Sequence, residues 1–176
     1  MAVWNVIDHQ ELTTGATTIT KSSIPASYDH LYLLISARTD ESTIIDECSF
    51  NANGSTFAEY SLTNMYAYTS TETSERRSGE TKFERMKVCG ASVLADTFSM
   101  IELWIPNYTN TDHYKQMTCK ISLPNNNASD YQWYYALMGL LWSNTAAINE
   151  LTLTNAGGDD FVQYSTWTLY GINGVA

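Results

Sequence analysis

Apolar and polar residues alternate along most of this chain, which is the period-two pattern of half-buried β-strands. Leu31, Leu33 and Ile35, for example, are separated by residues of the opposite face, and no long stretch has the spacing of an amphipathic helix. The predicted strands cover residues 2–8, 16–21, 29–38, 44–51, 58–68, 82–89, 97–105, 113–122, 131–142, 148–154 and 165–171.

Short turn-forming segments rich in Asn, Gly, Pro and Ser separate these strands, and the chain contains no internal repeat of the kind that builds propellers or solenoids. Many short strands at spacings of about 8–12 residues are typical of a sandwich or barrel. We therefore expect an all-β fold, a two-sheet β-sandwich that is jelly-roll-like, with residues 1–176 forming one domain.

One segment, 69–81, breaks the alternation because it is polar and charged throughout. Without a large apolar side chain it cannot offset the entropy of ordering by burial, so we expect an exposed loop. Basic and acidic residues alternate within and just after it, which favours a salt-bridged loop or a docking loop over a nucleic-acid site. Its candidate partner-contact residues are Arg76, Arg77 and Glu80.

The segment 131–142 is unusual for a sandwich strand because both of its faces are apolar. One face can fill the core, and the other must be covered by a loop of the same chain, a second layer or another subunit. We expect the even-numbered face to be the subunit interface of a homo-oligomer, with a covering loop as the alternative. The predicted interface residues are Tyr134, Met138, Leu140 and Trp142.

Composition narrows the functional classes. The chain has nine Lys and Arg against 19 Asp and Glu, a formal net charge of -10, so we expect no binding to nucleic acid or to an anionic membrane. No stretch approaches the roughly 20 apolar residues of a membrane span, and the N-terminal residues do not resemble a signal peptide. The cysteines Cys48, Cys89 and Cys119 form no C-x-x-C pair and are expected to be small buried hydrophobes.

Motifs for catalysis are missing from the sequence: it has no G-x-S-x-G, no P-loop, no H-E-x-x-H and no EF-hand pattern. We therefore expect no enzyme activity, no cofactor and no metal, although a glycan hydrolase built on paired carboxylates stays open because sequence cannot show their separation. The five tryptophans and 12 tyrosines could instead form sugar-stacking platforms, but core packing or subunit contact is the simpler account of aromatic residues on strands.

A set of short motifs follows a fixed order over about residues 20–172. They are Ile24-Pro25, Tyr28–Leu33, Ser36–Arg38, Phe50-Asn51, Gly54, Tyr60, Ile101-Glu102, Ile105–Tyr108, Gln132-Trp133, Leu141–Ile148, Phe161 and Ser165–Ile172. Together, in this order, they resemble a family of structural proteins from the virions of tailed bacteriophages of aquatic bacteria. The chain departs from the family pattern at 69–87, which is more charged than usual.

The resemblance implies a jelly-roll-like fold and a place on the virion, after synthesis in the host cytoplasm, but no catalytic residues. The leading hypothesis is a capsid decoration (cement) protein that binds the major capsid protein or another virion protein without covalent bonds. The resemblance also favours a homotrimer, because decoration proteins often occupy three-fold positions. The alternative is a carbohydrate- or receptor-binding module of a tail fibre or spike.

Overall fold

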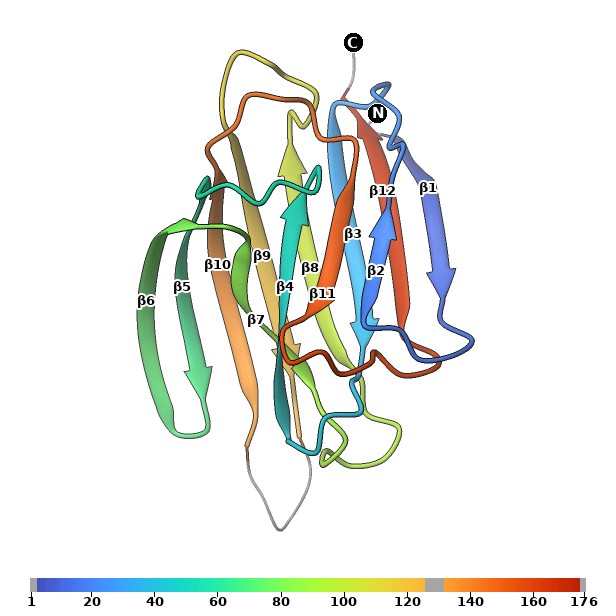
Figure 1. Ribbon diagram of the computed structural model, residues 1–176, viewed down its shortest axis with the longest axis vertical. Coiled ribbons are helices and arrows are strands. Elements are labelled where there is room, and N and C mark those ends of the chain that lie inside the picture. Colours follow the sequence, from blue (N-terminus) through green and yellow to red (C-terminus); the bar gives the residue numbers. More distant parts are fainter. Residues whose placement is uncertain (1–2, 126–131, 175–176) are drawn as a thin grey trace.

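The computed structural model describes residues 3–125 and 132–174, and this part of the chain contains strands and no helix. The strands are β1 (Val3–Glu11), β2 (Thr18–Lys21), β3 (His30–Ala37), β4 (Ile45–Ala52), β5 (Tyr60–Tyr68), β6 (Thr71–Glu80), β7 (Phe83–Cys89), β8 (Ser99–Pro106), β9 (Lys115–Leu123), β10 (Tyr134–Trp142), β11 (Leu151–Asn155) and β12 (Thr166–Asn173). Figure 1 shows them running roughly along the long axis of the molecule.

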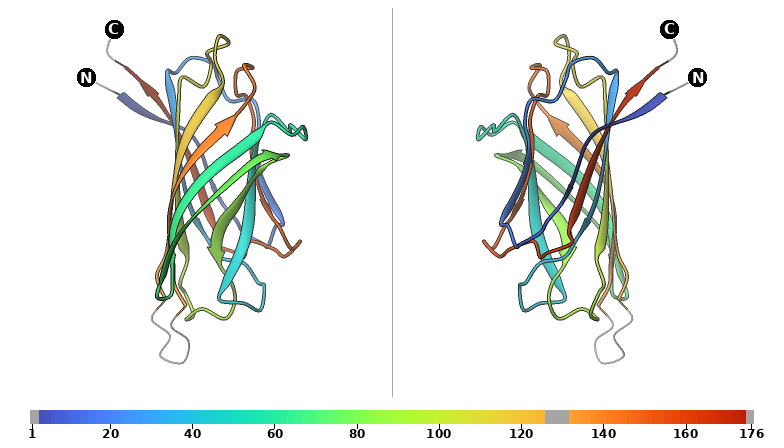
Figure 2. Two further views of the ribbon diagram at one scale, coloured as in Figure 1. Left: turned by 90° about the vertical axis from the view of Figure 1, so that its left-hand side faces the viewer. Right: turned by 90° about the vertical axis from the view of Figure 1, so that its right-hand side faces the viewer.

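Two antiparallel sheets pack face to face as a sandwich (Figure 2). The larger sheet has eight strands in the order β1-β12-β3-β8-β9-β10-β5-β6, and the smaller has four in the order β2-β11-β4-β7. Because the smaller sheet has half as many strands, it covers only part of the larger one. The predicted all-β sandwich is confirmed, and it is consistent with a jelly-roll-like fold.

The prediction that 69–81 forms a loop is wrong, because Thr71–Glu80 forms the edge strand β6. It pairs with β5 in a regular antiparallel register from Tyr68↔Thr71 to Tyr60↔Glu80, with one irregularity next to Tyr60. An edge strand gains ladder hydrogen bonds from one neighbour and needs no apolar face, and charged side chains protect its free edge from unwanted pairing. Its residues are exposed or half-buried, as expected for this segment.

The core lies between the sheets and follows the predicted alternation. Leu31, Leu33, Ile35 and Ala37 are all buried on the inner face of β3, and Phe50 of the smaller sheet stacks on Trp167 of the larger one at a ring-centroid distance of 6.4 Å. All three cysteines are buried free thiols, as predicted. Burial raises the pKa of Cys119 to about 12 and that of Cys48 further, so both stay neutral and inert.

Candidate functional site

The prediction of a subunit interface on the even-numbered face of β10 is wrong, because this face belongs to the core of the single chain. Tyr134, Met138, Leu140 and Trp142 are each at most 4% exposed. Trp142 stacks on Tyr60, and its Nε1 donates to Glu59 Oε2 at 3.1 Å. Residue 131, at the start of the predicted strand, lies outside the described residues.

The residue pattern of the neighbouring strand β9 shows which face of β10 is buried. On β9 the alternation is clean, with Met117, Cys119 and Ile121 buried between exposed or half-buried polar residues. Met138 pairs with Cys119 in the register of β10 against β9, so the even residues of β10 must share the buried face. The pattern of β10 taken alone could not show this, because both of its faces are apolar.

The odd-numbered face of β10 points outward and carries an apolar patch. Tyr135 is 51% and Leu137 43% exposed, and their cross-strand neighbours on β5 are Ala67 and Met65, the latter 63% exposed. We call Met65, Ala67, Tyr135 and Leu137 the outer patch. No other described segment covers it, so the spare apolar face of this strand is the odd-numbered one, opposite to the face that was predicted.

A trough lies beside the outer patch on the same face of the larger sheet. Its floor is Gly139, whose cross-strand neighbours are Thr63 and Thr118. Continuing outward in the same row, Arg76 pairs with Thr63 and Trp104 with Thr118. The trough encloses about 650 Å³ and lies between a guanidinium at one end and an indole at the other.

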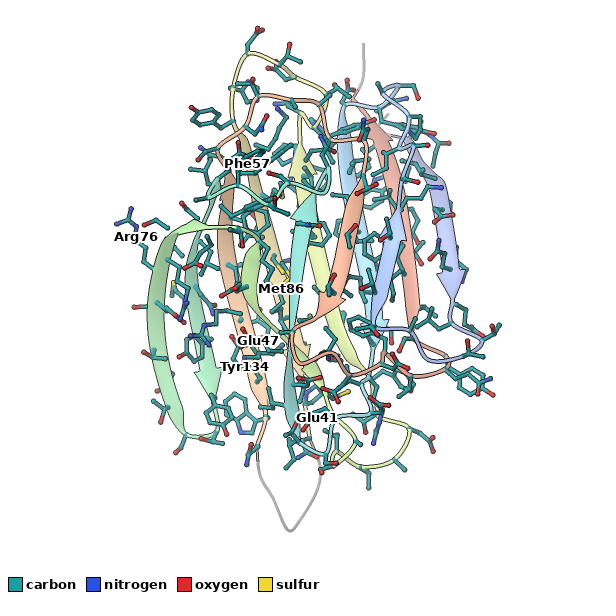
Figure 3. All side chains as sticks on the ribbon, viewed as in Figure 1. Glu41, Glu47, Phe57, Arg76, Met86 and Tyr134 are labelled. Atoms are coloured by element: carbon teal, nitrogen blue, oxygen red, sulfur yellow. The ribbon has the colours of Figure 1, made fainter. Side chains whose placement is uncertain are left out.

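Strand β6 separates the predicted contact residues, because neighbouring residues of a strand point to opposite faces. Arg76 is exposed and lines the trough, and Figure 3 shows its side chain projecting away from the strand. Arg77 instead forms ion pairs with Glu75 at 2.5 Å, Glu80 at 3.7 Å and Glu84 of β7 at 3.8 Å. Arg77 and Glu80 therefore belong to a network that links β6 to β7.

A second cavity, the inter-sheet cleft, opens between β5 and β6 on one side and β4 and β7 on the other. It encloses about 600 Å³ and is lined by Ile45, Asn64, Tyr66, Tyr68, Ser74, Glu75, Arg85, Lys87, Gln132 and Tyr134. Of these residues only Tyr134 was a predicted site residue, and it was predicted as part of a subunit interface. One signal was present: Asn64 occupies an inward position of β5, next to the apolar Leu62, and a polar residue on a buried face needs a partner.

The aromatic wall of the cleft comes from β5 and β10. Asn64, 1% exposed, donates from its side-chain amide to the Tyr134 hydroxyl at 3.2 Å. Tyr66 stacks on Tyr134 with 5.5 Å between ring centroids. Burial raises the pKa of Tyr134 to about 12, so its hydroxyl stays protonated and can donate a hydrogen bond.

The charged wall of the cleft comes from the smaller sheet and β6. Lys87 of β7 binds Glu47 of β4 at 2.5 Å, and Arg85 lies 3.4 Å from both Glu47 and Glu75. Burial opposes ionisation of Glu47, but the Lys87 hydrogen bond and charge outweigh it, and the pKa of Glu47 is lowered. Figure 3 labels Glu47 and Tyr134, which come from opposite sheets. Glu75 is shared between Arg85 and Arg77, so this wall is continuous with the network that links β6 to β7.

Arg85 is held in place by an irregular backbone. Its φ is +68°, a left-handed conformation that costs a non-glycine residue roughly 1–2 kcal/mol. It lies in a β-bulge, where Glu84 and Arg85 together oppose Ser49 on β4. Bulges commonly re-aim a side chain, and this one directs Arg85 to the cleft.

The described ranges, 3–125 and 132–174, contain no group of three or more His, Cys, Asp and Glu side chains placed to hold a metal ion. Over the same residues there is no helix long and apolar enough to cross a membrane. No protein-family model matches this chain, and no significant match was found among curated proteins or solved structures.

Proposed function

We propose that this protein is a structural protein of a bacteriophage virion, acting as a capsid decoration protein that docks through the outer face of its larger sheet. The observation that carries the proposal is the outer patch, where Met65, Tyr135 and Leu137 are exposed on adjacent strands. These side chains are about half exposed, so covering the rest of each would contribute on the order of 1 kcal/mol.

The remaining support comes from the sequence. The ordered motifs that resemble phage virion proteins span most of the chain, and the net charge of -10 makes a protein surface a better partner than a nucleic acid. A protein that binds only the assembled shell stabilises it by mass action. The partner in this proposal is the major capsid protein or another virion protein.

The same patch offers a second use within this proposal, a homo-oligomer. A symmetric interface covers one patch on every copy. A trimer is preferred because decoration proteins often lie at three-fold positions, which is part of the resemblance. In this proposal the interface uses Tyr135 and Leu137 in place of the buried face of β10.

The experiment compares binding of two charged variants to phage shells that lack the protein. Leu137→Glu puts a carboxylate in the outer patch, and Thr18→Glu puts the same charge on an exposed position of β2, in the smaller sheet. We expect Leu137→Glu to lose binding to shells while Thr18→Glu retains it. Absence of the protein from purified particles, or equal binding by both variants, would contradict the proposal.

The trough favours a second candidate function, a carbohydrate- or receptor-binding module. Trp104 stands beside the side-chain-free floor at Gly139, and threonines on either side offer hydroxyls. An indole next to an open polar surface is a common way to stack a sugar ring. Binding of a host polysaccharide that Trp104→Ala abolishes would support this candidate, and silence across a broad glycan array would count against it.

A further inference from the structure

An unpaired cation lines the trough on the outer face of the larger sheet. Arg76 is exposed, it is the only charged residue of the trough lining, and its guanidinium forms no ion pair within the described residues. Its neighbours on the same face of β6 are Ser74 and Ser78, because residues two apart in a strand share a face. Glu72 lies four residues away, which is about 13 Å along the strand. The guanidinium is therefore open to solvent and able to pair with an anionic ligand.

Three other carboxylates near Arg76 in the sequence are engaged elsewhere. Glu75, Glu80 and Glu84 all pair with Arg77, whose side chain belongs to the opposite face of β6. The chain carries a net charge of -10, yet within the described residues no carboxylate is placed against Arg76. A guanidinium matches a planar carboxylate through two parallel hydrogen bonds, so a carboxylate is the group that suits this end of the trough.

The opposite end of the trough is aromatic. Trp104 of β8 borders both the trough and a smaller hollow of about 210 Å³. Glu102 and Lys120 line that hollow and pair with each other at 3.6 Å, so this end offers no unpaired charge. A ligand of the trough therefore has a direction, with its anionic group at Arg76 and an apolar ring face at Trp104.

The distance between the two ends sets the length of the ligand. One cross-strand row runs from β6 to β8, through Arg76, Thr63, Gly139, Thr118 and Trp104. Its ends are about 19 Å apart at the usual spacing of about 4.8 Å between strands. A single sugar ring cannot touch both end side chains, whereas a chain of about two to four rings can. The volume of about 650 Å³ lies within the usual range of about 300–1,000 Å³ for small-ligand sites.

The floor of the trough suits a sugar chain. Thr63 and Thr118 are exposed on either side of Gly139, and a Cβ atom at Gly139 would meet no atom within 4 Å. A glycine inside a strand weakens the sheet and often marks a place where a ligand approaches closely. Sugar rings fit this surface, because their C–H faces pack on an indole while their hydroxyls bond to threonine hydroxyls.

We propose that the trough binds an acidic oligosaccharide of about two to four rings, which lies across the strands with a carboxylate on Arg76 and a ring face on Trp104. The inference rests on the second candidate function, saccharide binding in the trough, and adds the charge, length and direction of the ligand. A neutral glycan gains nothing from Arg76, whereas a carboxylate there forms charge-assisted hydrogen bonds.

The experiment is an NMR titration of the ¹⁵N-labelled full chain with acidic oligosaccharides and their neutral counterparts. The pairs are trigalacturonate and its methyl ester, hyaluronan tetrasaccharide and chitotetraose, and sialyllactose and lactose. We expect at least one acidic member to shift the Trp104 indole and Gly139 amide signals saturably, with about tenfold higher affinity than its counterpart. Arg76→Gln should remove this preference, and Trp104→Ala should weaken binding of both members.

The matched controls are Lys82→Gln, which removes a positive charge, and Trp133→Ala, which removes an exposed indole; neither residue lines the trough, and both variants should bind as the wild type does. If the neutral members bind as tightly, or if Arg76→Gln keeps the preference, the inference is overturned while saccharide binding in the trough stands. If no oligosaccharide shifts the trough signals, both are overturned. Equal shifts with acetate, showing an adventitious ion only, or with triglutamate, showing a peptide site, would also overturn the inference.

Discussion

Each face of the β5–β10 pair departs from the usual distribution of residues at a few positions. The outward face carries the exposed apolar side chains of Met65, Tyr135 and Leu137, while the inward face carries Asn64, almost fully buried. Folding stability alone favours the opposite arrangement at each of these positions. The outer surface is the one on which the proposed docking rests, whereas the inner Asn64 is held by its hydrogen bond to the Tyr134 hydroxyl.

A second comparison concerns two buried polar side chains on the inner face, which differ in how fully they are hydrogen-bonded. Lys115 of β9 is completely buried, but its Nζ donates to the carbonyls of Asn110, His113 and Thr145 at 2.5, 3.1 and 3.0 Å. Asn64 on β5 makes one side-chain hydrogen bond and leaves Oδ1 without any. Lys115 therefore finds acceptors for its buried charge within the chain, whereas Asn64 uses only part of its hydrogen-bonding capacity.

The largest expected effect distinguishes the two faces of β10. Trp142→Ala should lower the free energy of unfolding by about 3–5 kcal/mol, because it removes a buried indole, its stacking on Tyr60 and its bond to Glu59. Leu137→Ala on the outer face should change it by about 0.5 kcal/mol or less. Urea denaturation of both variants measures the contrast. Similar losses would mean that both faces are packed.

The next effect tests the contrast between Lys115 and Asn64. Lys115→Met should cost about 2 kcal/mol, because three carbonyls lose a charged donor. Asn64→Leu/Tyr134→Phe replaces a polar pair with apolar groups of similar size and should be neutral or stabilising. Thermal and urea unfolding measure both. A loss as large in the double variant would show that Asn64 is a structural residue.

The charged wall of the cleft predicts a pH dependence. Because the pKa of Glu47 is lower in the folded protein, its contribution is fully present above its unfolded value of about 4.3 and is lost as pH falls through the lower folded value. Glu47→Gln should therefore cost about 1 kcal/mol at pH 7 and less at pH 3.5, measured by urea titration. Glu72→Gln, at an exposed position of β6, is the control. A gap that stays constant with pH would argue against the ion pairs as its source.

The smallest effect on stability is expected in the trough. A Cβ atom at Gly139 would meet no atom within 4 Å, so Gly139→Leu should change the free energy of unfolding by about 0.5 kcal/mol or less, measured by urea denaturation. The leucine should fill the trough and abolish any saccharide binding there. A loss of stability as large as that of Trp142→Ala would show that the outer face at Gly139 is packed.

The alternation of apolar and polar residues was enough to predict the fold class and most of the strands. Eleven of the 12 strands in the described residues correspond to predicted segments. A half-buried strand needs apolar and polar residues in alternation, and this is visible in the sequence, as from Leu31 to Ala37. Strand β6 was missed because an edge strand held by hydrogen bonds to β5 needs no apolar residue, so its pattern resembles that of a loop. The site was harder, since Asn64, Arg85 and Lys87 meet only after two sheets pack.

By itself the sequence determined the all-β class, the single sandwich, the buried thiols and the presence of an apolar strand with one face to spare at 134–142. Only the tertiary structure decided which face of that strand is spare, which of Arg76 and Arg77 faces outward, and where Asn64 and Arg85 meet. The physical reason is that period and polarity are local properties of a strand. Facing and proximity depend on register with distant strands, such as the pairing of Met138 with Cys119.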